Sequence, residues 1–334
     1  MKIGLIDADG GNWPNLALMK ISAFHKKQGD TVEWCVPILH YDKVYVAKVF
    51  GDEYSRYEDF AINADEVVFG GTGFAITIEN GKEVYHKDRD KDLPYEVEHS
   101  FPDYGLYPEL TKGKAYGFLT RGCCNDCSFC IVSKKEGRCS HKVANLDEFW
   151  NGQDEIILYD PNILACPERE ELLEQLAATG KIVDFTQGLD ARFITEDVAK
   201  LLSKIRMRTA HFAFDFMKNE KKITEGLKNA RKYMTIRDKD ATVYMLTNYD
   251  TTHYEDLKRI KIIQECGFQP DVRIYRKNTA PRFTRDLQRW CNNRVLHYSS
   301  DFWDYQARKD EGTMKDVYKD IYAEWKAIMS KVQK

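Results

Sequence analysis

The sequence predicts an α/β protein in three parts: a small α/β domain, a partial β/α barrel and a helical C-terminal extension. Short apolar runs alternate with segments whose apolar residues recur at helical spacing, and the alternation becomes regular after Ala115. Alternating strand and helix patterns are typical of parallel β/α units. The chain has 334 residues, 43% of them hydrophobic, which is enough for more than one core and excludes disorder.

The front of the chain, residues 1–80, is predicted to be a small Rossmann-like α/β domain. MKIGLIDA forms a strand, Gly10-Gly11 a turn, and Leu16, Met19 and Ala23 recur at helical spacing. Further apolar strand patterns follow at TVEWCVP, 43–50 and 66–71. Residues 81–112 are charged, rich in Asp, Pro and Tyr, and lack a period, so they are interpreted as a linker or covering loop.

Residues 113–280 are predicted to form a partial (β/α)6 barrel, and 281–334 a helical C-terminal extension. The helical pattern after the second strand has Pro167 near its start and Gly180 at its end, and Thr195 can cap the next helix. A weaker helical pattern lies near 145–150. The strand patterns are 115–120, 155–160, 181–187, 208–215, 242–249 and 271–276, and the clear helical patterns are 167–180, 195–205, 223–233 and 252–267.

Charge and composition narrow the classes of function. Lys and Arg total 50 against 53 Asp and Glu, so the net charge of -3 offers no global field for nucleic acid. The apolar start is interrupted by acidic and Gly residues too early for a signal peptide, and no run approaches the ~20 apolar residues that span a bilayer. We therefore predict a cytoplasmic protein without membrane contact, in which nine reduced cysteines indicate metal binding or catalysis.

The sequence RGCCNDCSFC follows the first strand of the predicted barrel. Cys123, Cys127 and Cys130 form a Cys-x3-Cys-x2-Cys pattern, with Cys124 as an extra thiol. Three thiolates can hold three irons of a 4Fe-4S cluster, whereas a closed electron-transfer cluster normally takes four, so one iron stays open to another ligand. This spacing, in this strand context, resembles the radical S-adenosylmethionine superfamily over about residues 113–280.

The resemblance implies a chemistry and its cofactors. The open iron would chelate the amine and carboxylate of S-adenosylmethionine, and Phe129 would lie beside the adenine. An electron from the cluster would cleave the sulfonium to methionine and a 5′-deoxyadenosyl radical, which would abstract hydrogen from an unidentified substrate. A reductant such as flavodoxin or ferredoxin is implied as a partner. The resemblance leaves methyl transfer, methylthio transfer and simple hydrogen abstraction open.

The alternative is a non-catalytic binding module stabilised by zinc or a cluster, with nucleic acid as a candidate ligand. A zinc knuckle would use Cys124, Cys127 or Cys130 with Cys139 or His141. Structural zinc favours two Cys-x2-Cys pairs separated by a longer loop, and here the available pairs overlap. The sequence therefore favours the cluster.

Polar residues follow the later strands of the predicted barrel, where loops of β/α folds carry chemistry. Each could contact S-adenosylmethionine, and the Arg192 guanidinium could bind its carboxylate with two hydrogen bonds. The other interpretation is local, because Asp and Asn after a strand often cap the next helix or form an Asx-turn. The predicted cofactor contacts besides Phe129 are Asp160, Asn162, Gln187, Asp190, Arg192, Asp215 and Asn248.

The front domain also resembles the cobalamin-binding subgroup of this superfamily, whose domain carries Asp-x-His-x-x-Gly, Ser-x-Leu and Gly-Gly. Here residues 7–12 read Asp-Ala-Asp-Gly-Gly-Asn, the Ser neighbourhood reads Val46-Ala47-Lys48, and Gly70-Gly71 follows. Asp9 stands where the histidine would bind cobalt. The resemblance therefore implies a degenerate domain, with cobalamin bound, if at all, without this ligand.

Residues 257–294 hold ten Lys or Arg against three acids, and they interleave Phe283 and Trp290. Basic residues among aromatics can follow a nucleic-acid backbone and stack bases. They can also form a solvated face that pairs with the acids at 301–311. Given the balanced charge of the chain, the sequence favours the solvated face.

Overall fold

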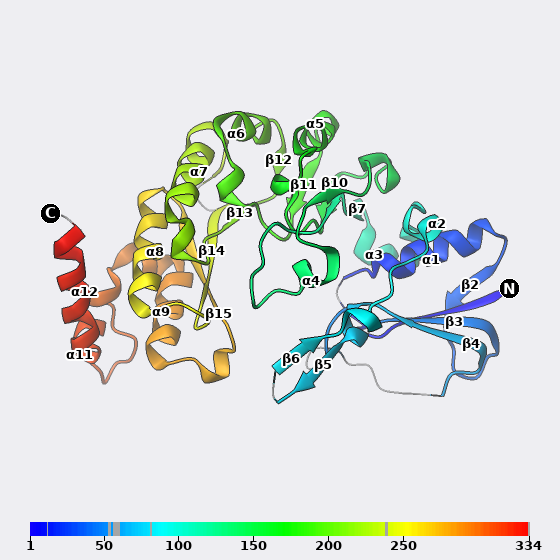
Figure 1. Cartoon of the computed structure of the whole chain (residues 1–334), viewed down its shortest axis with the longest axis horizontal. Coiled ribbons are helices and arrows are strands. Elements are labelled where there is room, and N and C mark those ends of the chain that lie inside the picture. Colours follow the sequence, from blue (N-terminus) through cyan, green and yellow to red (C-terminus); the bar gives the residue numbers. More distant parts are fainter. Residues whose placement is uncertain (12, 53–54, 56–60, 81, 238–239, 333–334) are drawn as a thin grey trace. The chain divides into compact units, whose positions relative to one another are not determined.

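The computed structural model of the protein describes residues 1–334 except 12, 53–54, 56–60, 81, 238–239 and 333–334 (Figure 1). The chain divides into two compact units, Met1–Gln187 and Gly188–Lys334. Asn12 of the predicted cobalamin motif, Gly81 of the predicted linker and the last two residues of the predicted extension lie outside the described residues. The predicted domain boundaries at 80, 112 and 280 stay predictions.

The first unit begins with a parallel sheet in the order β2-β1-β3-β4. Helix α1 packs on one face of it, where Leu18 and Ile21 meet Ile3 and Leu5. The helix begins where the Asn15 side chain accepts a hydrogen bond from the Leu18 backbone N–H at 3.2 Å. The elements are β1 (Lys2–Asp7), α1 (Leu16–Lys27), β2 (Thr31–Trp34), β3 (Tyr41–Ala47) and β4 (Ala64–Gly70).

The segment that was interpreted as a linker or covering loop contains regular structure. Strand β6 pairs antiparallel with β5, and two short α-helices and two 3-10 turns follow it. The sequence did not indicate them because each is only one turn or four residues long, too short to show a period. Their bounds are β5 (Ile76–Glu79), β6 (Lys82–Tyr85), α2 (Tyr95–Glu98) and α3 (Pro108–Thr111).

A second parallel sheet of the first unit has β10 between β7 and β11. All four residues of β10 are buried, which explains why its sequence reads as an unbroken apolar run after Glu155. The weak helical pattern near 145–150 is a single 3-10 turn, Leu146–Glu148. The elements are β7 (Lys114–Gly117), β8 (Thr120–Arg121), α4 (Val132–Glu136), β9 (His141–Lys142), β10 (Glu155–Leu158), α5 (Arg169–Thr179) and β11 (Ile182–Phe185).

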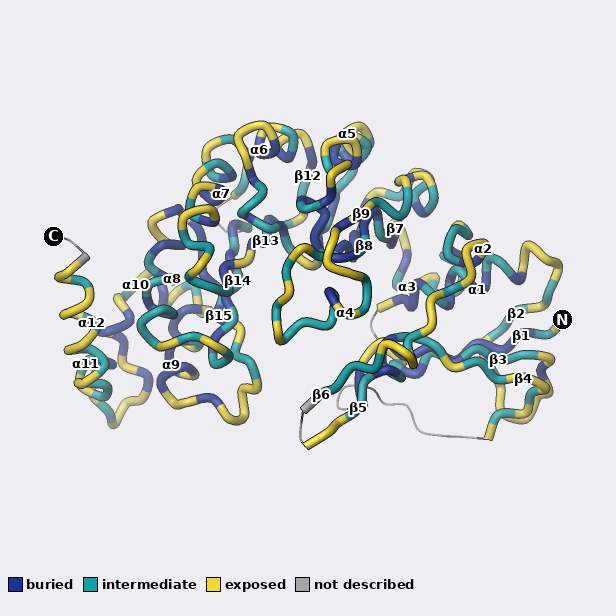
Figure 2. The backbone as a smooth tube through the Cα atoms, in the orientation of Figure 1, coloured by how far each residue is buried: buried dark blue, intermediate teal, exposed yellow. Residues whose placement is uncertain are grey.

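The second unit contains a parallel sheet in the order β13-β14-β15. Thr195 caps α6, as predicted, by accepting a hydrogen bond from the Val198 N–H at 3.3 Å. Figure 2 shows exposed outer turns on α6 and α7 and largely buried strands. The elements are α6 (Glu196–Leu202), β12 (Arg206–Met207), β13 (Ala210–Ala213), α7 (Glu220–Tyr233), β14 (Ala241–Thr247), α8 (His253–Glu265) and β15 (Gln269–Ile274).

The remainder of the second unit is helical. Helix α9 packs against β15, and its side chains Phe283, Leu287 and Trp290 are buried. From Met314 onward the chain forms two helices that are separated at Tyr318. The elements are α9 (Arg282–Asn292), α10 (Arg294–Ser299), α11 (Met314–Val317) and α12 (Lys319–Val332).

The architecture is thus mixed α/β with parallel sheets, as predicted. The strands predicted for the barrel fall into two parallel sheets, and the partial (β/α)6 barrel stays a prediction. Among the described residues, no helix combines the length and the apolar character needed to cross a membrane.

Candidate functional site

The cysteine loop lies between β8 and α4 in the first unit. Cys123, Cys127 and Cys130 are half-buried, and Cys124 is exposed. The Cys130 N–H donates to the Cys127 carbonyl at 2.9 Å, which forms a tight turn between these two cysteines. In the described part of the chain, no three His, Cys, Asp or Glu side chains are gathered as a metal ion would need them.

Backbone contacts close the base of this loop. The Gly122 N–H donates to the Glu136 carboxylate at 3.0 Å, and the Cys123 N–H donates to the Gly137 carbonyl at 3.2 Å. Gly122 has a φ of +81°, and a Cβ there would lie 2.2 Å from the Cys139 carbonyl oxygen. Only glycine fits directly before the first cysteine.

Glu136 also connects the loop to the front of the first unit through Arg121. The Arg121 guanidinium pairs with Glu136 at 2.9 Å and with Glu98 at 3.9 Å, and it stacks over the Phe118 ring at 3.4 Å. Glu98 on α2 pairs in turn with Lys20 on α1 at 2.8 Å. A chain of alternating charges therefore runs from α1 to the base of the cysteine loop.

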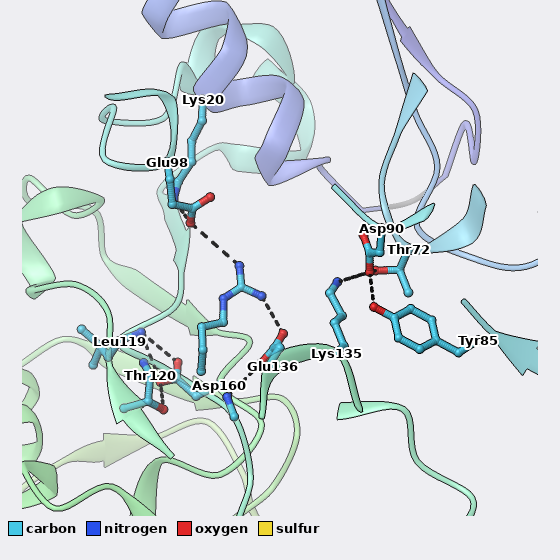
Figure 3. Close-up of polar contacts among 12 residues, drawn as sticks. Lys20, Thr72, Tyr85, Asp90, Glu98, Leu119, Thr120, Lys135, Glu136 and Asp160 are labelled. Atoms are coloured by element: carbon cyan, nitrogen blue, oxygen red, sulfur yellow. Dashed lines mark hydrogen bonds and ion pairs between the residues drawn. The ribbon is translucent and has the colours of Figure 1, made fainter. Parts of the chain in front are cut away.

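A second connection runs from α4, directly after the loop. The Lys135 ammonium contacts the Thr72 hydroxyl and lies 3.7 Å from Asp90 (Figure 3). Asp90 also accepts a hydrogen bond from the Tyr85 hydroxyl at 2.8 Å, and Lys87 donates to the Lys135 carbonyl at 2.7 Å. The cysteine loop is thus fixed on both sides to residues of the first unit that precede the predicted barrel.

Asp160 lies beneath the loop, two residues past the end of β10, and is buried. Its carboxylate accepts hydrogen bonds from the N–H groups of Leu119 and Thr120 at 3.1 and 2.6 Å and from the Thr120 hydroxyl at 2.7 Å (Figure 3). Burial raises the pKa of Asp160 to about 6, and these hydrogen bonds oppose the shift. Asp160 therefore holds the strand that leads into the loop, and its predicted cofactor contact stays a prediction.

Asn162 brings the end of β10 to the cysteines. Its side-chain nitrogen donates to the Cys123 Sγ at 3.6 Å. Its backbone carbonyl accepts a hydrogen bond from the Ser140 hydroxyl at 2.9 Å. The Asn125 N–H also donates to the Cys123 Sγ, at 3.5 Å. Amide donors beside a cluster-bound thiolate stabilise its negative charge, so this donor set fits an iron–sulfur cluster.

The remaining candidates of the first unit are Phe129 and Gln187. Phe129 is half-buried within the cysteine loop. Gln187 is exposed at the end of the unit, and its side chain donates to the Thr186 hydroxyl at 3.5 Å. Their predicted cofactor contacts stay predictions.

In the second unit, Asp190 and Arg192 pair with each other. The Arg192 Nε donates to the Asp190 carboxylate at 2.8 Å, and the guanidinium makes a second contact through Nη2. Asp190 also accepts the Arg192 backbone N–H at 3.2 Å, which is the local capping role that the sequence offered as an alternative. The guanidinium predicted to bind the S-adenosylmethionine carboxylate thus holds a carboxylate of the chain itself.

Asp215 and Asn248 also have protein partners. Asp215 accepts a hydrogen bond from the Leu246 N–H at 2.9 Å, and burial raises the pKa of its carboxyl. Asn248 adopts a φ of +61° and donates its amide to the Tyr275 carbonyl at 2.8 Å. Both residues fix the ends of neighbouring strands.

Arg259 on α8 belongs to the basic segment 257–294, for which the sequence favours a solvated face, and for this residue that prediction is wrong. It is fully buried and donates to the carbonyls of Phe214, Asp215 and Leu246 at 2.8, 2.8 and 2.9 Å. It also pairs with Asp256. The available signal was the position of Arg259 between Leu257 and Ile260, in the apolar stripe of the helix.

The front domain does not offer the cobalt ligand of the cobalamin-binding subgroup. The Asp9 carboxylate, at the histidine position, accepts hydrogen bonds from the backbone N–H groups of Val49 and Phe50 at 2.6 and 3.4 Å. Lys48 is buried, and a Cβ on Gly73 would lie 2.6 Å from its side chain. Asp9 thus ties the loop after β1 to the loop after β3, and these residues do not fit a protein ligand to cobalt.

Comparison with known proteins identifies a likeness in fold. No family model matches the sequence, and no curated protein matches it. A solved structure of TsrM from Kitasatospora setae, a radical S-adenosylmethionine methyltransferase with cobalamin and a [4Fe-4S] cluster bound, matches with a TM-score of 0.60. The sequences are 11% identical, and the match covers 82% of this chain and 72% of that one. The chain shares this fold.

Proposed function

We propose that the chain is a radical S-adenosylmethionine enzyme that holds a 4Fe-4S cluster through Cys123, Cys127 and Cys130. The observation that carries the proposal is the Asn162 amide, 3.6 Å from the Cys123 Sγ, because it joins the end of a second parallel strand to the cysteine loop. The fold likeness supports an enzyme of this type. When bound, the cluster supplies the electron that cleaves S-adenosylmethionine to methionine and a 5′-deoxyadenosyl radical.

The chain's own residues would hold and tune this site. The three thiolates bind iron, while the Asn125 N–H and the Asn162 amide donate hydrogen bonds to the Cys123 sulfur. Glu136 fixes the first turn of the loop through the Gly122 N–H. The two donors stabilise negative charge on the Cys123 sulfur, which favours uptake of an electron.

Binding of S-adenosylmethionine is proposed to use Phe129 and the polar strand-end residues. Arg192 is the candidate for the carboxylate, because its guanidinium can donate two hydrogen bonds to a carboxylate, as it does to Asp190, which S-adenosylmethionine would have to displace. Gln187, Asp215 and Asn248 supply further polar groups. A low-potential reductant such as flavodoxin or ferredoxin is required, and the proposal leaves the substrate open.

The test is anaerobic reconstitution with iron and sulfide, reduction with dithionite, and chromatography for 5′-deoxyadenosine after addition of S-adenosylmethionine. We expect deoxyadenosine from the wild type and none from Cys127→Ala. Cys124→Ala is the matched control, since this thiol lies in the same loop but outside the spacing, and we expect it to retain turnover. If the protein instead binds one zinc, takes up no iron and leaves S-adenosylmethionine intact, the proposal fails and a binding module replaces it.

A further inference from the structure

A basic groove lies on the outer side of α9 in the second unit. It has a volume of about 740 Å³, and the cations Lys277, Arg285, Arg289 and Arg308 line it together with the amides Gln288 and Asn292. Arg285 and Arg289 are exposed and lie one helical turn apart, so their side chains project from the same face of the helix. The groove belongs wholly to one unit.

One of the four cations of the basic groove, Arg308, is neutralised by acids of the chain. Arg308 pairs with Asp286 at 3.3 Å and with Glu311 at 3.4 Å. Asp286 is buried and also accepts a hydrogen bond from the Tyr318 hydroxyl at 2.7 Å.

Across the described residues, the other three cations, Lys277, Arg285 and Arg289, have no carboxylate within ion-pair distance. Of the acids at 301–311, Glu311 pairs instead with Arg282 and Arg308, and Asp304 pairs with Lys315. The groove thus retains three positive charges in a chain whose net charge is -3.

The amides of the groove are already engaged by the edge of the sheet. Asn292 accepts the Val272 N–H at 2.8 Å and donates to the Val272 carbonyl at 3.1 Å, and Gln288 donates to the same carbonyl at 2.9 Å. These contacts cover the edge of β15 at Val272, so a partner strand cannot pair there. The cations are therefore the groups of the groove that remain to bind a ligand.

We propose that the basic groove binds the backbone of a single-stranded nucleic acid through phosphate contacts from Lys277, Arg285 and Arg289. A guanidinium group can donate two parallel hydrogen bonds to the oxygens of one phosphate. A flexible strand can place successive phosphates on cations one helical turn apart. The aromatic side chains of α9, Phe283 and Trp290, are buried on the opposite face and cannot stack bases. Binding is therefore independent of base sequence.

The test measures anisotropy of a fluorescein-labelled 20-nucleotide oligo-dT with the full-length protein over a range of KCl concentrations. Three phosphate contacts on a single strand predict a slope of about -2 in log K against log salt, and each substitution among Lys277→Gln, Arg285→Gln and Arg289→Gln should reduce its magnitude by about 0.7. The triple variant should lose at least tenfold in affinity at low salt. Thermal unfolding verifies that it remains folded.

The matched control is the triple variant Lys218→Gln, Lys221→Gln and Lys228→Gln. These lysines line a second hollow of about 740 Å³ on α7, whose lining also contains Glu220 and Glu225. The change in net charge is the same, so we expect affinity within about twofold of wild type if the groove itself binds the strand. Equal losses in both triple variants would overturn the proposal.

Two other results would also overturn it. Preference for a duplex of the same sequence would assign the groove to double-stranded nucleic acid. Complete competition by inorganic phosphate or a mononucleotide, with no dependence on oligonucleotide length, would assign it to a small phosphorylated ligand. The measurement uses neither S-adenosylmethionine nor a reductant, so it stands or fails independently of the proposed reaction.

Discussion

The side-chain amide of Asn162 donates a hydrogen bond to the Sγ of Cys123 across 3.6 Å. Asn162 follows β10, and Cys123 begins the loop that follows β7 and β8, so the contact joins the carboxyl ends of two parallel strands. A donor at this sulfur stabilises negative charge on it. Any cluster bound by Cys123 will then be easier to reduce.

We predict that Asn162→Leu, a substitution of similar volume, lowers the midpoint potential of the reconstituted cluster. Loss of one hydrogen bond worth about 0.5–1.5 kcal/mol corresponds to a decrease of about 20–60 mV for one electron. The measurement is a redox titration followed by electron paramagnetic resonance. Asn151→Leu, on an exposed turn, serves as the control, and an unchanged potential in Asn162→Leu would contradict the assigned role.

Glu136 should control the order of the cysteine loop before a cluster is inserted. We predict that Glu136→Gln weakens both the Gly122 N–H contact and the Arg121 pair, because a neutral amide accepts these hydrogen bonds less strongly. A loss of about 1 kcal/mol would make alkylation of Cys123 by iodoacetamide several-fold faster. Mass spectrometry of the labelled peptide measures this rate. Glu174→Gln on the exposed face of α5 should leave it unchanged.

Asp160 should make the stability of the protein depend on pH in a defined direction. Burial raises its pKa to about 6 from 3.8, so the folded state binds the proton more tightly than the unfolded chain. This stabilisation is fully present below about pH 4 and is lost as the pH rises through about 6. The shift corresponds to about 3 kcal/mol.

We therefore expect the free energy of unfolding of the wild type, minus that of Asp160→Asn, to fall by about 3 kcal/mol between pH 4 and 7. Asparagine keeps the carbonyl oxygen that accepts from Leu119 and Thr120 but does not titrate. Other carboxyl groups titrate in both proteins and cancel in the difference. Denaturant titrations at each pH provide the measurement. A difference in the free energy of unfolding that does not change with pH would show that the pKa of Asp160 is not raised in the folded protein.

The features that the sequence predicted are those encoded over short distances. The apolar run at 155–158 is a buried strand, Thr195 caps its helix, and the cysteine spacing places three thiols in one loop. Each depends on residues within about ten positions of one another. Periodicity and capping report such local relationships directly.

The features that the sequence missed depend on contacts between distant residues. Arg121 is followed by the cysteines, yet its role comes from Glu98 and Lys20, which lie far before it. Asp160 was assigned to a helix cap or a cofactor contact, whereas its carboxylate holds backbone about 40 residues away. Partners of this kind are chosen by tertiary packing, which no local pattern encodes.

Arg259 provides the last and largest expected effect on stability. Its guanidinium is fully buried and satisfies the carbonyls of Phe214, Asp215 and Leu246, together with Asp256. Replacing it by methionine keeps much of the volume but leaves Asp256 as an unpaired buried charge. We predict that Arg259→Met lowers the free energy of unfolding by about 3–5 kcal/mol.

The double variant Arg259→Met/Asp256→Leu separates the two parts of this cost. Removing the unpaired Asp256 carboxylate should recover part of the stability. The three carbonyls that lose the Arg259 donor keep the free energy of unfolding of the double variant below that of the wild type. Arg237→Met, which breaks an exposed pair with Asp240, should cost less than about 1 kcal/mol. Denaturant midpoints of the full-length proteins measure all three. If the single and double variants were equally destabilised, the cost would come from the lost carbonyl contacts rather than from the buried charge of Asp256.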